Sequence, residues 1–127
     1  MTTLTTASRN AACDAVVDLV DAGTTNPNGQ LIFRTSGDVE VATLNMSNPA
    51  YGNAASGVAT ANSISDDTSA TGGTTTKATI EDRNNTEVME LTVTAVSGGG
   101  DIELAGGTTI GAGATVSVSS LTHTQPA

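Results

Sequence analysis

A chain of 127 residues has room for one domain with a modest core, since it contains one Phe, one Tyr and no Trp. Thirteen acidic residues against four basic ones give a net charge of −9, and the scattered bases exclude a clustered basic patch for nucleic acid. The single Cys13 excludes an internal disulfide, and no stretch approaches the roughly 20 apolar residues of a membrane helix. The start lacks a signal-peptide pattern, so we expect a soluble protein made in the cytoplasm.

The N-terminal segment carries the helical pattern of this chain. Residues 1–5 are predicted to form a short polar arm, and a single helix is predicted over residues 6–23. Thr6 or Ser8 is expected to cap its first turn, and Gly23 is expected to end it in a left-handed conformation. The predicted helix therefore precedes the rest of the domain.

The two faces of this helix are predicted to differ. Asp14, Asp18 and Asp21 recur at helical spacing and share one face. The opposite face is expected to pack on the core, and it holds Ala12, Ala15, Val16, Leu19 and Val20. Such a helix is expected to close the open end of a β-sandwich. A second role for it would be to offer its aspartates to a basic surface on a partner.

From residue 29 onward the hydrophobic pattern has the period of β-strands. Turn residues at 36–37 and 83–85 predict two hairpins. Strands are predicted over 30–35, 38–46, 58–64, 74–82, 86–96, 101–104 and 114–124. Short strands at this spacing indicate a mainly β fold, an antiparallel β-sandwich or jelly roll with one N-terminal α-helix. Residues 6–127 are thus expected to form a single β-sandwich domain.

Few side chains in this sequence could carry out chemistry. His123, the single histidine, could belong to a Ser-His-Asp triad, but it lies on the closing strand and no G-x-S-x-G elbow accompanies it. Cys13 is expected to behave as a small hydrophobe on the helix. The stretch Gly111-Ala112-Gly113 precedes a strand, whereas a dinucleotide-binding loop precedes a helix. We therefore expect no enzyme activity, no catalytic residue and no cofactor.

Two acidic loops and one aromatic residue are candidate binding sites. Asp66 and Asp67 in one loop, and Asp101 with Glu103 after a glycine run, could supply oxygen ligands to Ca²⁺. The glycine-rich match occurs once, while calcium repeats of that kind work in tandem, so solvated loops without metal are expected. Tyr51 could stack on a sugar, but a sugar-binding module usually has several exposed aromatics. Packing of its loop onto the fold is expected instead.

Four stretches of the sequence, which cover nearly the whole chain, carry a resemblance to a known family. They are LTTASRNAACDAVVDLVDAG at 4–23, TSGDVEVATLNMSNPAYG at 35–52, ASGVATANSISDDTSATGG at 55–73 and GGGDIELAGGTTIGAGATVSVSSLTHTQPA at 98–127. The helix opening and the closing Gln-Pro-Ala are the most distinctive parts. Together the stretches resemble small virion proteins of tailed bacteriophages, the head decoration (cement) proteins.

This resemblance implies a β-sandwich that binds the outer face of the shell of major capsid protein and stabilises the head against the pressure of the DNA inside. The implied partners are the major capsid protein and further copies of the chain, as a homo-oligomer such as a trimer. The implied location is the surface of the virion head, after synthesis in the host cytoplasm. The resemblance supplies no set of binding residues.

Two alternatives to head decoration stay open at this point. One is another virion structural protein, a tail or fibre component that contacts the host surface. The other is a minor hydrolase that uses His123. Particle labelling distinguishes the first alternative from head decoration, and substitution of His123 tests the second.

Overall fold

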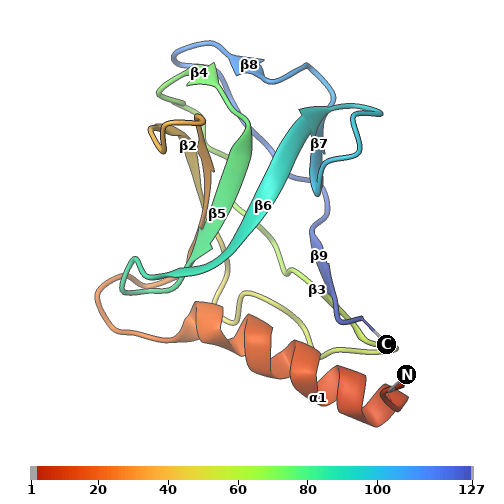
Figure 1. Cartoon of the computed structure of the whole chain (residues 1–127). Coiled ribbons are helices and arrows are strands. Elements are labelled where there is room, and N and C mark those ends of the chain that lie inside the picture. The colour runs from red at the N-terminus through yellow and green to blue at the C-terminus, as the bar shows by residue number, and fades with distance from the viewer. Residues whose placement is uncertain (1–2, 127) are drawn as a thin grey trace.

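The computed structural model describes residues 3–126, which begin with a helix and continue as strands around one curled sheet (Figure 1). The chain is therefore mainly β with one N-terminal helix, as predicted. The helical elements are α1 (Thr6–Val17) and the 3-10 turn η1 (Asp18–Asp21). The strands are β1 (Gln30–Arg34), β2 (Glu40–Asn45), β3 (Val58–Thr60), β4 (Gly73–Thr74), β5 (Lys77–Glu81), β6 (Glu87–Ala95), β7 (Ile102–Leu104), β8 (Thr109–Ile110) and β9 (Thr122–Thr124).

Helix α1 begins at a different cap from the predicted one. The cap is Thr5, whose Oγ1 accepts a hydrogen bond from the Ser8 N–H at 3.1 Å, so the prediction of Thr6 or Ser8 was wrong. The 3-10 turn η1 extends the helix nearly to Gly23, which has the positive φ predicted for it, 105°. Within residues 3–126, neither helical element has the length and apolar character needed to cross a membrane.

The packed face of the helix also differs from the predicted one. Cys13, Val17 and Val20 are buried, whereas Leu19 is 54% exposed. Of the residues predicted to face the core, only Val20 is buried. The prediction failed because it assumed that the aspartate face is turned to solvent, and two of those aspartates take part in the packing themselves.

The main sheet has the strand order β2-β1-β5-β6-β7. The predicted hairpins are present, and they join β1 to β2 and β5 to β6 in antiparallel fashion. Strand β7 runs parallel to β6, with Ile102 beside Val93, so an entirely antiparallel sheet was a wrong prediction here. The chain returns tightly because Gly98 and Gly100 pass so close to Thr94 that an added Cβ would lie 2.6 and 2.9 Å from its side chain.

The remaining strands form two separate pairs, β3 with β9 and β4 with β8. Both strands of the first pair are shorter than the predicted strands at 58–64 and 114–124. Between β8 and β9, Val116 makes only an isolated bridge to Asp67, and its side chain is buried. The segment before β9 is therefore less extensively paired than predicted.

A buried cluster of apolar side chains unites the helix, the main sheet and the C-terminal segment. Leu31 lies opposite Leu44 on β2 and Ile80 on β5, and all three side chains are fully buried. From outside the sheet the cluster takes in Cys13, Val17, Val20, Ala59, Val116 and Leu121. Helix α1 crosses one end of the sheet (Figure 1), and its first turns lie beside the C-terminal segment, where Arg9 donates to the Gln125 carbonyl.

Candidate functional site

Cys13 and His123 meet in the structure, but through the main chain of the histidine. The buried Sγ of Cys13 donates to the backbone oxygen of His123 at 3.5 Å. His123 pairs with Ala59 across β3 and β9, and its Nε2 is buried without a hydrogen-bond partner among the described residues. The contact therefore holds α1 against β9 and does not involve the imidazole.

Tyr51 packs into the core, as expected for its loop. Its side chain belongs to the buried cluster, the residue is 6% exposed, and its backbone bridges to Ala61. Burial raises the pKa of Tyr51 to about 12, and the neighbouring Cys13 adds to this effect. A ring buried in this way offers no free face to a sugar.

The titration of Tyr51 is expected to report on folding. Because the chain has one tyrosine, tyrosinate absorbance measures this group alone. We expect the absorbance to rise near pH 12 in the folded protein and near pH 10 in urea-unfolded protein. The folded state holds the phenolic proton of Tyr51 more tightly than the unfolded state does. The contribution of Tyr51 to the free energy of unfolding is therefore complete below pH 10 and is lost as the pH rises toward 12. A folded-state midpoint near pH 10 would contradict the assignment.

Asp67, considered as a calcium ligand, instead closes the outer edge of β2. Its carboxylate accepts hydrogen bonds from the backbone N–H groups of Thr43 and Ser69, both at 2.9 Å. Segment 65–72 runs along β2 and adds backbone hydrogen bonds to the same edge. The neighbouring Asp66 is exposed. This arrangement protects an edge strand from pairing with other chains.

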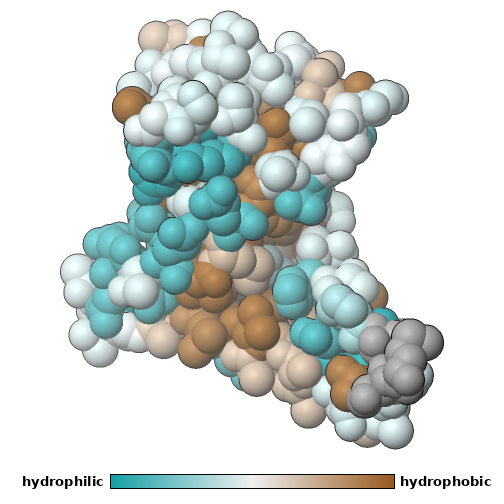
Figure 2. Space-filling model, in the orientation of Figure 1, coloured by the Kyte–Doolittle hydropathy of each residue, from teal (hydrophilic) through white to brown (hydrophobic). Residues whose placement is uncertain are grey.

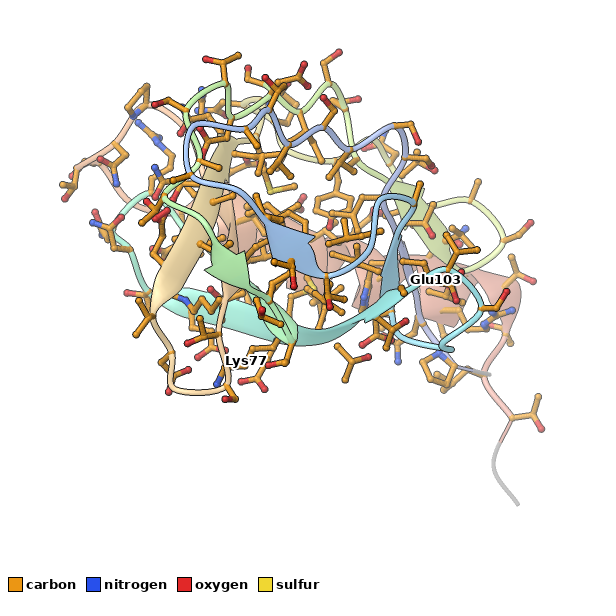
Figure 3. The ribbon with its side chains drawn as sticks, turned by 90° about the horizontal axis from the view of Figure 1, so that it is seen from above. Lys77 and Glu103 are labelled. Carbon is orange, nitrogen blue, oxygen red and sulfur yellow. The ribbon has the colours of Figure 1, made fainter. Side chains whose placement is uncertain are left out.

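The second acidic loop is also engaged with backbone N–H groups. Asp101 Oδ2 accepts from the Thr92 N–H at 2.9 Å, and Glu103 accepts from the Gly99 N–H at 3.2 Å. Figure 3 shows Glu103 well apart from Lys77, so this loop and that base do not share a site. Over residues 3–126, no three His, Cys, Asp or Glu side chains are grouped to hold a metal ion.

Two of the helix aspartates hold the long loop that follows β2. Asp14 Oδ1 accepts from the Ala54 N–H at 2.7 Å, and Asp21 Oδ1 accepts from the Ala50 N–H at 2.9 Å. The third aspartate, Asp18, is exposed to solvent, whereas Asp14 and Asp21 are partly buried. Sequence reasoning missed this role, although the seven-residue spacing of the two buried-side aspartates places them on the same face.

Replacing Asp14 by alanine is expected to lower the free energy of unfolding by about 1–3 kcal/mol, because the Ala54 N–H would lose a charged acceptor in a partly buried site. Asp18→Ala is the matched control on the same helix, and we expect a change within about 0.5 kcal/mol. Urea denaturation measures both. Equal losses for the two variants would show that the loop contact does not stabilise the fold.

Two of the four basic residues form ion pairs on the outer face of the main sheet. Arg34 Nη2 lies 2.8 Å from Glu81 Oε2, and Arg34 Nε also donates to the Thr79 hydroxyl at 3.0 Å. Lys77 pairs with Asp38. The hydrogen bond and charge of Lys77 lower the pKa of Asp38, and the same hydrogen bond raises the pKa of Lys77.

The other two basic residues bind backbone oxygens. Arg9 donates to the Gln125 carbonyl at 3.0 Å, and Arg83 donates to the Asn26 carbonyl at 2.8 Å. All four basic side chains of the chain are therefore engaged within it. Among the described residues, the exposed acids that form no ion pair are Asp18, Asp66, Glu87, Glu90, Asp101 and Glu103. The surface is acidic, and its bases are occupied.

A groove of about 360 Å³ lies between β6 and β9. Its walls are Met89, Glu90 and Leu91 from β6, the three residues of β9, and Asp101. In Figure 2, hydrophilic side chains follow β6 across this face, and an apolar hollow lies beside them. Sequence reasoning missed the groove because β6 and β9 are far apart in the chain, and no local pattern indicates that they meet.

Over the described residues the surface carries an excess of acidic charge, and the groove beside β6 is one of its hollows. Asp14, Asp21, Tyr51 and Cys13 are used in packing. Comparison of the chain with models of known protein families, with curated proteins and with solved structures gave no match.

Proposed function

We propose that this protein is a structural component of the virion of a tailed bacteriophage, a head decoration (cement) protein. In this role it binds the outer face of the shell of major capsid protein and stabilises the head against the pressure of the DNA inside. Several copies, in the simplest form a trimer, bridge neighbouring capsid subunits. The resemblance of the four sequence stretches described above supports this proposal.

The observation that carries the proposal is the use of all four basic side chains inside the molecule. Six exposed acids have no ion-pair partner among the described residues, and the chain has a net charge of −9. Such a surface repels phosphate and is complementary to a basic protein surface, which steers docking and fixes its orientation. A protein that binds a basic partner would use a surface of this kind.

We further propose that the fold is organised as a β-sandwich of the jelly-roll kind. The main sheet is one layer in this interpretation, and the β3–β9 and β4–β8 pairs belong to the other. The support is that Ala59 of β3 and Leu121, which directly precedes β9, are buried in the same cluster as Leu31 and Phe33. Two layers that share one core are the defining feature of such folds.

Immunogold labelling of intact particles tests the location. We expect label over the head, together with a copy number in purified virions that is comparable to that of the capsid protein. Because the contact is electrostatic, washing in high salt should release the protein from the particle. Label confined to the tail would instead support a tail or fibre component that contacts the host surface. Absence of the protein from the particle would contradict both functions.

A further inference from the structure

The groove beside β6 is bordered by backbone groups of β6 that pair with no other strand. Val93 donates to Thr76, while the Thr92 N–H points the other way, toward Asp101. Backbone groups of an antiparallel strand alternate in direction, so Glu90 also turns its N–H and C=O away from β5. Strand β7 covers β6 only from Val93 to Ala95. The main chain at Glu90 is therefore open along the groove.

Strand β9 presents a similar open edge at the same groove. The Ala61 N–H donates to Leu121, and the Gln125 N–H donates to Gly57. By the same alternation, Thr122 and Thr124 turn their N–H and C=O groups away from β3. Both threonines line the groove. Main-chain donors and acceptors thus border it on two sides, which is the geometry required for strand addition.

The side chains of the groove select the charge of an occupant. Glu90 and Asp101 are exposed acids on its walls, and no Lys or Arg lines it. Met89 and Leu91 add apolar surface between them. A second copy of the chain would place glutamate against glutamate on paired edges, and like charges in that arrangement are destabilising. A segment with basic side chains would be stabilised at the same positions.

We propose that this groove binds an extended segment of a partner protein, rich in lysine or arginine, which adds as a strand to β6. Its backbone pairs with Glu90, and its far edge faces β9. Its basic side chains lie near Glu90 and Asp101. The identity of the partner rests on the proposed function, in which the segment belongs to the shell protein. The site itself follows from the strand edges.

A blocked hexapeptide of alternating lysine and threonine is a suitable probe for the full-length protein. We expect its addition to slow amide hydrogen exchange at Glu90, Thr122 and Thr124, while a peptide with glutamate in place of lysine has no effect. Glu90→Pro removes an N–H that β5 does not use, and we expect it to weaken binding about tenfold. Glu90→Gln keeps the N–H and should weaken binding less. Glu103→Gln, an acid outside the groove, should leave affinity unchanged.

Unslowed exchange at Glu90 in the wild-type protein, or equal affinity for wild type and a folded Glu90→Pro, would overturn the groove assignment. The exchange experiment on the wild type decides the matter even where the proline variant does not fold. If the protein coats heads without binding the peptide, the groove assignment fails and the proposed function stands. If the protein binds the peptide but is absent from particles, the groove assignment stands and the proposed function fails.

Discussion

Replacing Phe33 by alanine is expected to lower the free energy of unfolding by about 3–5 kcal/mol. Phe33 is fully buried, and it is the largest of the fully buried side chains and the only phenylalanine of the chain. Its partners on the neighbouring strands are Ala42 and Ala78, whose methyl groups cannot fill the space that the ring would leave. Urea denaturation followed by circular dichroism measures the loss.

Two controls separate the cavity from other effects at this site. Phe33→Leu keeps most of the volume and should cost clearly less than the alanine variant. Val39→Ala, at a residue that is 62% exposed, is expected to change stability by no more than about 0.5 kcal/mol. A loss at Phe33 no larger than the loss at Val39 would mean that the core is centred elsewhere.

Replacing Gly29 by alanine is expected to lower the free energy of unfolding by about 1–3 kcal/mol through overpacking. Gly29 lies between η1 and the main sheet, where an added Cβ would clash with the Val20 side chain and lie 2.8 Å from the Glu81 backbone oxygen. A backbone oxygen cannot move aside as a flexible side chain can. The helical segment would therefore be pushed away from the sheet, and urea denaturation measures the cost.

Gly37→Ala provides the matched control for this substitution. An added Cβ at Gly37 would have its nearest neighbour 3.8 Å away, on the Thr35 side chain, and the residue has no positive φ. We expect no loss of stability there, because the change only restricts the unfolded chain. Similar losses at the two glycines would show that the close contacts at Gly29 do not set the cost, since restriction of the unfolded chain by alanine can only stabilise.

The local parts of this fold were predictable from sequence because each has a local cause. The two hairpins are examples, since their turns use residues that tolerate a left-handed backbone. Asp38 has a φ of 67° and Asn85 a φ of 63° in the structure. Aspartate and asparagine adopt this conformation more readily than most residues. The position of the helix and its end at Gly23 were also predictable, because helical spacing and a glycine are local features of the sequence.

The long-range parts were not predictable, because no neighbouring residues encode them. Strand β3 pairs with β9 across more than half the chain, and nothing in either segment specifies the other. The helix face was assigned wrongly because Asp14 and Asp21 look like solvent-facing residues until the loop that they hold is in place. Burial of a carboxylate is acceptable once N–H groups satisfy it, and sequence alone does not reveal those groups.

The acidic candidates illustrate the same limit at the level of the site. Sequence reasoning considered Asp67, Asp101 and Glu103 as ligands for a cation, and the structure engages each of them with backbone N–H groups. Both interpretations use the same carboxylate oxygens. The choice between them depends on which backbone groups lie nearby, and that is a property of the fold.

The position of helix α1 has a consequence for the biosynthesis of this chain. Its residues are made before the strands, yet Asn10 binds the Gly57 N–H, and Arg9 binds the Gln125 carbonyl, which lies 116 residues further along the chain. A helix of 12 residues is marginal on its own in water. Helix α1 is therefore made before the segments that hold it, and it becomes stable only after those segments have been made.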